Sequence, residues 1–300
     1  QTIVILDFGG QYKELIARRV RECGVYSVIL PYDTNVEEVA ALKPIGIIFT
    51  GGPNSVYAED SPKCSMGIFK LGVPVLGICY GMQLICHLFG GTVVTCHASE
   101  YGTLDAKVDT TSDLFRQLSP EQPVLMSHTD MVSKLPSGFR PIASTAFCPV
   151  AAFENFGEKI FGVQFHPEVE NTRNGSKMIN NFLYRVCGAA GDYSMDDYLS
   201  RKVKEVKERV GNKRVLLGLS GGVDSSVCAA LLSRAIPGQL VCIYVDHGFM
   251  RKGETQQIRE AFEGRDLDFV YVDAKDRFIS KLAGVTDPEQ KRKIIGAEFA

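Results

Sequence analysis

The stretch from residue 73 to residue 91 limits the possible folds of this chain more than any other. Residues 73–78 form an apolar run with the length of a strand that is covered on both faces. Residues 84–89 are again largely apolar and stop at two glycines, which is typical of the C-terminal end of a helix. The stretch therefore predicts a buried strand, a sharp turn that carries Cys79, and a helix.

The same alternation is repeated along the chain. Short apolar runs at 2–6, 26–30 and 46–50 are separated by segments with helical spacing, and a β-rich segment follows between 91 and 161. Further on, a predicted buried strand at 214–219 is followed by a helix and by two more strands. This order predicts an α/β fold with two domains, each with a mainly parallel sheet flanked by helices.

The composition is that of a globular protein with about two domains. The chain has 300 residues, a hydrophobic content of 45% and a net charge of −2, which argues against a bulk nucleic-acid or membrane-surface binder. No apolar run has the length of a membrane span. The nine cysteines are scattered and include no Cys-x-x-Cys pair, so we expect reduced thiols in a cytoplasmic protein and no structural zinc.

Cys79 has the surroundings of a nucleophile. Gly77 and Gly81 flank it with the spacing of the G-x-S-x-G nucleophile elbow, with cysteine in place of serine. The predicted position at a helix N-terminus favours the thiolate, which attacks carbonyl carbon. The alternative is a buried structural cysteine, so a base and an oxyanion site are needed to support the interpretation.

A candidate base lies near residue 166. His166 and Glu168 follow an alternating apolar segment, and in an extended segment side chains two residues apart point the same way. The carboxylate of Glu168 is then placed to orient the imidazole of His166. The alternative for this segment alone is a histidine at a strand end beside a solvated glutamate.

A candidate oxyanion site lies at the Gly-Gly-Pro sequence of residues 51–53. Such a sequence is often only a turn, but beside a nucleophile it can aim backbone N–H groups at a developing oxyanion. We predict the amides of Gly52 and Tyr80 as the two donors, because Tyr80 directly follows the nucleophile.

Together these motifs resemble those of class I, or triad, glutamine amidotransferases, over about residues 1–187. The resemblance implies a flavodoxin-like domain in which Cys79 attacks the side-chain amide of glutamine, His166 shuttles the proton and Glu168 orients His166. A glutamyl thioester forms and ammonia leaves.

The resemblance also implies glutamine-binding residues. Gln83, Ser127, His128 and Asp130 lie where the family contacts its substrate. Thr129 departs from the pattern, because close relatives have glycine there, and this puts the backbone conformation of residues 127–130 in doubt.

The second half of the chain contains a different motif. A glycine-rich segment at 188–192 is typical of a linker, and a charged amphipathic helix is predicted at 195–210. The strand at 214–219 then runs into Ser-Gly-Gly-Val-Asp-Ser-Ser at 220–226 and into a helix, which is the arrangement of a phosphate cradle. We predict domains at 1–187 and 213–300, joined by a linker and connecting helix at 188–212.

This loop has no lysine, so it is not a Walker A motif, and it resembles the loop of the ATP pyrophosphatase (adenine nucleotide α-hydrolase) family. These enzymes cleave ATP between its α and β phosphates. The resemblance implies that Mg²⁺ is bound at Asp224 and that ATP is bound by Ser220, Gly221, Gly222, Val223, Asp224, Ser225, Ser226 and Val245.

The two halves together resemble enzymes that aminate XMP to GMP with glutamine and ATP, which release AMP and pyrophosphate. The resemblance implies a homodimer formed through a C-terminal domain that is not in this chain. Lys291, Arg292 and Lys293 resemble part of a lid that meets phosphate, although an exposed charge run is an equal alternative. The chain begins without Met and ends within a predicted helix, so we expect that more protein follows.

Two other classes of function stay open. One is a different amidotransferase synthase, such as an anthranilate or carbamoyl phosphate partner subunit, against which the pyrophosphate loop argues. Enzymes that make asparagine or NAD carry such a loop but use glutaminases of other folds. The other class is a non-catalytic glutamine or nucleotide sensor, which would not need an activated thiolate, so the alkylation rate of Cys79 discriminates.

Overall fold

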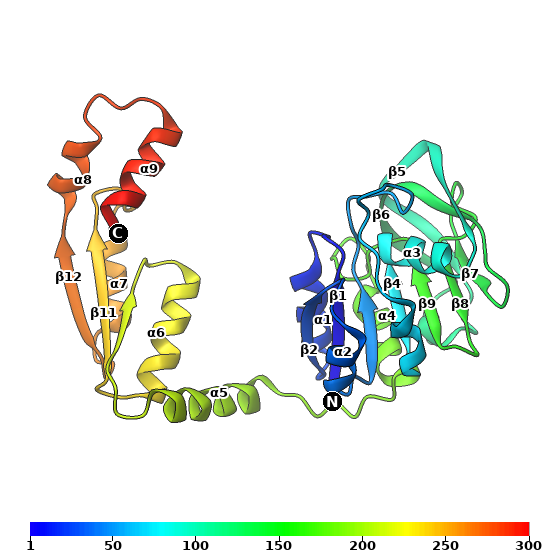
Figure 1. Cartoon of the computed structure of the whole chain (residues 1–300), viewed down its shortest axis with the longest axis horizontal. Helices are drawn as coiled ribbons and strands as arrows, with labels where there is room; N and C mark the ends of the chain where they lie inside the picture. Colours follow the sequence, from blue (N-terminus) through cyan, green and yellow to red (C-terminus); the bar gives the residue numbers. More distant parts are fainter. Residues whose placement is uncertain (300) are drawn as a thin grey trace. The chain divides into compact units, whose positions relative to one another are not determined.

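The computed structural model describes residues 1–299, except for the side chains of residues 96–100. The chain divides into two compact units, Gln1–Ser194 and a second unit that begins at Met195. The α/β class with two domains and two sheets is confirmed (Figure 1).

The first unit is built on one sheet, whose described strands follow the order β2-β1-β3-β4-β9-β8-β7-β5-β6. Its parallel half contains β1 (Thr2–Asp7), β2 (Tyr26–Pro31), β3 (Gly46–Phe49), β4 (Val75–Ile78) and β9 (Ile160–Val163). Its antiparallel half contains β5 (Thr92–Val108), β6 (Glu121–Lys134), β7 (Arg140–Ser144) and β8 (Ala152–Asn155). The β-rich segment thus extends the parallel sheet instead of forming a sheet of its own.

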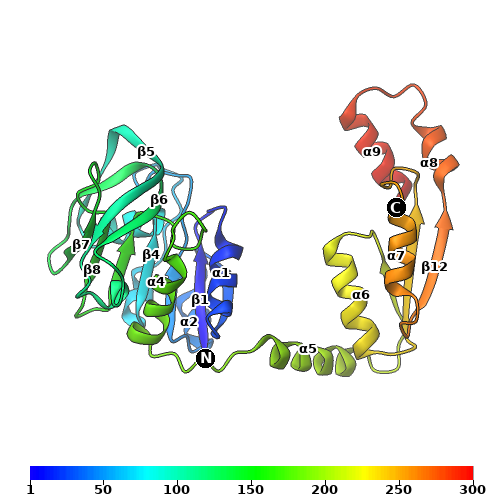
Figure 2. The same ribbon diagram turned by 180° about the vertical axis from the view of Figure 1, so that it is seen from behind.

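Helices cover both faces of the parallel half (Figures 1 and 2). Ile3 and Ile5 pack on one face with α1 (Lys13–Glu22) and α4 (Gly175–Asn181), which the π-helical turn η3 (Phe182–Val186) continues. Val4 and Leu6 pack on the other face with α2 (Val36–Ala41), the short helix η1 (Met66–Leu71) and α3 (Tyr80–Leu88). A further short helix, η2 (Asp113–Phe115), lies beside α4 and η3. Because both faces are covered, these strands are apolar at successive positions.

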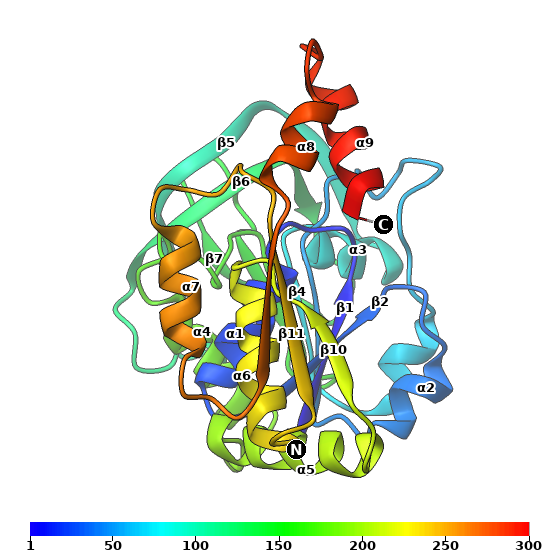
Figure 3. The same ribbon diagram turned by 90° about the vertical axis from the view of Figure 1, so that its left-hand side faces the viewer.

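The second unit contains a parallel sheet of β10 (Val215–Gly218), β11 (Leu240–Asp246) and β12 (Asp268–Asp273). Its helices are α5 (Met195–Val210), α6 (Val223–Ala235), α7 (Glu254–Phe262), α8 (Lys275–Lys281) and α9 (Pro288–Phe299) (Figure 3). Side chains of α6 and α7 form a core with alternate residues of the strands, among them Ala229, Ile258, Leu240, Cys242 and Tyr244.

The prediction of a buried strand at 214–219 is wrong. Leu216 in β10 is 69% exposed, and Val270 and Val272 in β12 are 41% and 39% exposed on the same face of the sheet. β10 lies at the edge of the sheet, and α6 and α7 cover only the opposite face within the described residues. The apolar run that predicted burial is therefore covered by helices on one face of the sheet only, within the described residues.

Candidate active site

Cys79 lies at the turn between β4 and α3, with φ +51° and ψ −106°. A positive φ is rare outside glycine, and such strained residues cluster at functional sites. The flanking glycines allow the turn to pack closely. A Cβ on Gly77 would lie 2.6 Å from the backbone of Gly81, and a Cβ on Gly81 would lie 2.6 Å from the Cβ of Phe49.

The glycine loop after β3 is fixed beside this turn. The hydroxyl of Thr50 accepts a hydrogen bond from the N–H of Phe8 at 2.9 Å, and the carbonyl of Thr50 accepts one from the N–H of Gly81 at 3.2 Å. A Cβ on Gly51 would lie 3.3 Å from Cε1 of His166 and 3.7 Å from Cβ of Cys79, so Gly51 lies between these two side chains. Among the described residues, no acceptor bonds to the N–H groups of Gly52 and Tyr80.

His166 and Glu168 form a buried pair, with Nδ1 of His166 2.7 Å from Oε1 of Glu168. The expected reason for their contact, a shared strand face, is wrong because β9 ends at Val163 and both residues lie in the turn that follows. Two hydrogen bonds to the backbone of this turn hold it in place. The N–H of His166 donates to the carbonyl of Leu125 at 3.1 Å, and Nε of Arg19 donates to the carbonyl of Glu168 at 3.0 Å.

The electrostatics of the pair favour an imidazolium. Burial alone would lower the pKa of His166, but its hydrogen bonds to Cys79 and Glu168 and their negative charges raise that pKa to about 10. Glu168 is fully buried, and its Oε2 has no hydrogen-bond partner in the described structure. The carboxylate of Glu168 therefore acts mainly on His166, which is held in its protonated form at neutral pH.

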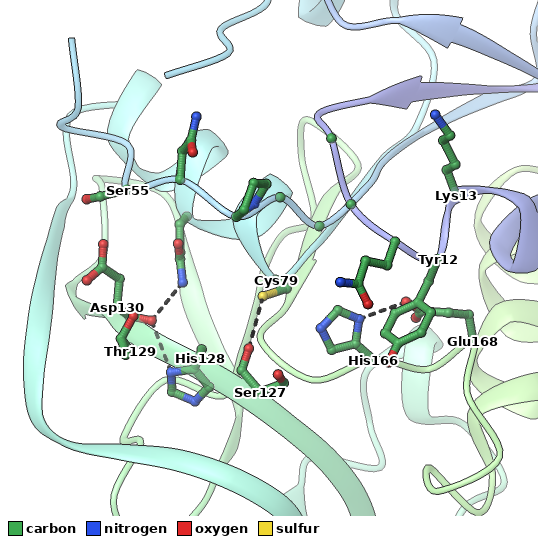
Figure 4. A pocket seen from close by; sticks show the side chains of 18 of the residues that line it. Tyr12, Lys13, Ser55, Cys79, Ser127, His128, Thr129, Asp130, His166 and Glu168 are labelled. Atoms are coloured by element: carbon green, nitrogen blue, oxygen red, sulfur yellow. Dashed lines mark hydrogen bonds and ion pairs between the residues drawn. The ribbon is translucent and has the colours of Figure 1, made fainter. Parts of the chain in front are cut away.

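These groups face one cavity of about 500 Å³, shown in Figure 4. The residues predicted from the sequence that line the cavity are Gly52, Cys79, Gln83, Ser127, His128, Asp130, His166 and Glu168. Only the backbone of Tyr80 belongs to the predicted site, because its buried side chain donates from the hydroxyl to the carbonyl of Pro62 at 2.6 Å.

Strand β6 carries the predicted glutamine-binding stretch along one wall of the cavity (Figure 4). Thr129 lies in the extended backbone of this strand, with its side chain exposed, so no glycine is needed at this position. The carboxylate of Asp130 accepts a hydrogen bond from the hydroxyl of Thr95 at 2.8 Å, and the Asp130 carbonyl accepts from Nδ1 of His128 at 3.0 Å.

The cavity also contains residues that sequence reasoning missed. Tyr12 contacts the ring of His166 edge-on, with ring centroids 5.3 Å apart, and Lys13 forms an ion pair of 2.6 Å with Asp7. Both follow β1, and the C-terminal ends of parallel strands are where ligands gather in such sheets, so this signal was available. Tyr101 reaches the cavity from β5, and no local pattern marks it.

In the second unit, residues 220–222 of the Ser-Gly-Gly-Val-Asp-Ser-Ser segment lie in the turn between β10 and α6, and residues 223–226 form the first turn of α6. Gly221 has φ +81°, and Gly222 is the N-cap of α6. The hydroxyls of Ser220 and Ser225 lie 3.0 Å apart, and the Ser225 hydroxyl donates to the carbonyl of Gly222 at 3.2 Å. These two contacts hold the shape of the loop.

The other residues predicted for the second unit lie on separate elements. Val245 is near the C-terminal end of β11, at the same end of the sheet as the loop. Lys291, Arg292 and Lys293 lie on α9, where Arg292 forms an ion pair of 3.5 Å with Glu289. Asp224 is exposed in the first turn of α6.

Comparison with known proteins defines the class of the first unit. Residues 4–186 match the family described as glutamine amidotransferase class-I, and the chain belongs to this family. A solved structure from Thermoplasma acidophilum, provisionally assigned as one of the subunits of a GMP synthase, is 31% identical, with a TM-score of 0.55 over 62% of this chain and 94% of that chain. Residues 194–290 match the family described as NAD synthase.

Two relatives that match both units carry the same name. The proteins named GMP synthase [glutamine-hydrolyzing] from Clostridium botulinum and Finegoldia magna are 53% and 54% identical to this chain over 300 and 299 residues. The matches cover 99% and 100% of this chain, which spans 58% and 59% of the length of these relatives. Among the described residues, no helix combines the length and the hydrophobicity needed to cross a membrane.

Proposed function

We propose that the protein to which this chain belongs aminates XMP to GMP, using ammonia from glutamine and releasing AMP and pyrophosphate from ATP. One observation carries the proposal. A buried His–Glu pair beside an elbow cysteine is joined, in one chain, to a Ser-Gly-Gly-Val-Asp-Ser-Ser loop, and both lie within a match to proteins named GMP synthase that is more than half identical.

In the first unit, the Cys79 thiolate would attack the side-chain amide carbon of glutamine. The N–H groups of Gly52 and Tyr80 would bind the oxyanion, since both are free of protein acceptors within the described residues. His166 would give its proton to the leaving ammonia and then take one from the water that hydrolyses the thioester. Glu168 would hold the imidazole in the orientation that this transfer needs.

We assign glutamine binding to Gln83, Ser127, His128 and Asp130. Asp130 is 9% exposed and lines the cavity, and its carboxylate would meet the α-ammonium group of the substrate. The ion pair of Lys13 with Asp7 at the same cavity offers a cation for the α-carboxylate.

In the second unit, Ser220, Gly221, Gly222, Val223, Asp224, Ser225 and Ser226 would bind the pyrophosphate part of ATP, with Val245 near the adenosine. The donor set fits Mg²⁺, because one exposed carboxylate, that of Asp224, stands beside the loop and Mg²⁺ takes most of its other ligands from water and phosphate. When bound, Mg²⁺ would neutralise charge on the leaving pyrophosphate. Lys291, Arg292 and Lys293 would approach phosphate from α9.

We further propose an amidotransferase domain at 1–187, a linker and connecting helix at 188–212, and an ATP pyrophosphatase domain from 213. The division into compact units at 194/195 falls within the proposed linker region. We propose a reducing, cytoplasmic location, supported by the free thiols of the cysteines whose side chains are described. A homodimer formed through a further domain is proposed on the family resemblance alone.

The loop provides a matched pair of variants. In Gly221→Ala, the new Cβ would lie 2.3 Å from Cδ1 of Ile258 at a φ of +81°, so the loop must change shape and we expect ATP affinity to fall by about tenfold or more. In Gly222→Ala, the nearest atom is the Ser220 hydroxyl at 3.4 Å and φ is −70°, so the loop should keep its shape. Titration of Mg-ATP into both variants of the complete protein measures the difference, and equal affinities would contradict the proposed role.

The proposed function is tested with the complete protein, ATP-Mg and glutamine, in the presence and absence of XMP. We expect release of AMP and pyrophosphate only when XMP is present. Release without XMP, or no release in its presence, would move the acceptor to another compound. Glutamate release, followed in the same samples, shows whether the first unit is active in either case.

A further inference from the structure

Gln164 is a fully buried polar residue that does not line the cavity. It follows β9, directly beside the nucleophile turn. Its Nε2 lies 3.6 Å from Sγ of Cys79, although the two residues are 85 positions apart in the chain. A buried amide needs hydrogen-bond partners, so the identity of those partners determines what this side chain does.

The direction of the hydrogen bonds follows from one backbone carbonyl. The carbonyl of Asp130 can only accept, and Nε2 of Gln83 lies 2.7 Å from it, so Gln83 donates. The same Nε2 lies 3.1 Å from Oε1 of Gln164 and supplies its second proton there. This fixes the oxygen of Gln164 towards Gln83, and its N–H group must then point at the sulfur of Cys79.

We propose that the side-chain amide of Gln164 donates a hydrogen bond to the Cys79 thiolate, stabilising its negative charge and holding Sγ at the cavity. The inference rests on the proposed function only in taking Cys79 as the nucleophile. Gln83 acts through Gln164 as a positioning residue, because its two amide protons bind Asp130 and Gln164. The sulfur then has two stabilising groups, the imidazolium of His166 and the neutral amide of Gln164.

The neutral donor complements the charges at the cavity. His166 provides the positive charge from the turn after β9, with Glu168 behind it. Lys13 from α1, paired with Asp7, and Asp130 from β6 line the same cavity. An amide lowers the energy of the thiolate without adding a charge that would change the protonation of His166.

Two variants separate this role from packing. Gln164→Met keeps the approximate volume and removes the donor. Gln164→Glu keeps the shape but turns an oxygen towards the thiolate, because Gln83 still donates to the other oxygen. The pH profile of Cys79 alkylation by iodoacetamide, followed by mass spectrometry of the Cys79 peptide, reports the thiolate. We expect its midpoint to rise by about one to two pH units in the methionine variant and at least as far in the glutamate variant.

Gln122→Met is the matched control. Gln122 is equally buried, and its amide donates to the carbonyl of Ser119 at 2.7 Å and accepts from Asn174 at 2.8 Å, away from the cavity. This variant should have a lower melting temperature, but the pH profile of Cys79 alkylation should not shift. If the methionine variant at 164 does not fold, the glutamate variant decides, since it preserves the side-chain shape.

The inference would be overturned if the folded Gln164 variants had a lower melting temperature but an unchanged midpoint of the Cys79 alkylation profile. Alkylation does not require glutamine, so a profile that shifts in a protein with no glutaminase activity would support the inference and reject the proposed function. Normal glutaminase activity of the unmodified protein, together with unshifted profiles, would support the proposed function and reject the inference.

Discussion

Replacement of Cys79 by alanine should lower glutamine hydrolysis by about 10⁴-fold or more, because Cys79 is the only thiol among the described residues that line the cavity. The sulfur is held at a strained turn, beside the imidazolium of His166 and the glycine loop, and alanine has no nucleophile to place there. The substitution removes one atom from a turn whose backbone is fixed by the close packing of Gly77 and Gly81, so the fold should persist.

The same variant tests the division of labour between the units. In the complete protein, synthesis from added ammonia should be retained, since the loop at 220–226 belongs to a different compact unit. Glutamate release and ammonia-dependent AMP formation are measured side by side. Cys86→Ala serves as the control, because Cys86 is a buried cysteine of the same helix whose thiol contacts the carbonyl of Lys134. Loss of both activities in the Cys79 variant would contradict the proposed separation.

Replacement of Glu168 by glutamine should lower the kcat of glutamine hydrolysis by about 10²- to 10⁴-fold. The carboxylate orients the ring of His166 and contributes to raising its pKa to about 10, so the variant has a misoriented and less basic imidazole. In the proposed mechanism the protonated ring supplies the proton to the leaving ammonia, so activity should fall as pH rises through that pKa. The alkaline limb of the kcat/KM profile, which reports the free enzyme, should therefore move from near pH 10 in the unmodified protein to lower pH in the variant.

The stability of the folded protein should also fall as pH rises. A histidine whose folded pKa lies above its unfolded value of about 6.5 adds stability that is fully present below that value and is lost as pH rises towards about 10. Glu154→Gln is the matched control, because Glu154 on β8 is a buried glutamate paired with Arg140 on β7. It should lower stability but leave the kcat/KM profile in place, and a similar change of profile in both variants would argue against a specific role of Glu168.

The predictable part of the site depends on short-range sequence patterns. Gly77, Cys79 and Gly81 lie within one turn, where the need for close packing determines the residue types. The pairing of His166 with Glu168 was expected from their spacing, but the expected reason was wrong, because a turn and not a strand brings them together. Alternation of apolar and helical segments was sufficient for the α/β class.

The features that were not predicted from the sequence depend on contacts between distant segments. Gln164 has the appearance of an ordinary strand residue, and its partners come from α3 and the turn before it, which only the folded sheet brings near. Tyr101 reaches the cavity because β5 is long and antiparallel to β6. The exposure of Leu216 could not be read from its apolar neighbours, since burial of a strand depends on what covers each face.

The order of the strands in the first sheet also affects the protein while it is being synthesised. β4, which ends at the nucleophile, lies between β3 and β9, and the segment after β9 supplies His166, Glu168 and Gln164. A ribosome that adds about 5–20 residues per second needs about 4–17 s to cover the 85 positions from Cys79 to Gln164. During this interval the nascent chain carries an ordinary thiol without its activating partners. If Cys79 is activated as proposed, it becomes reactive only once the domain that controls its reactivity has been made.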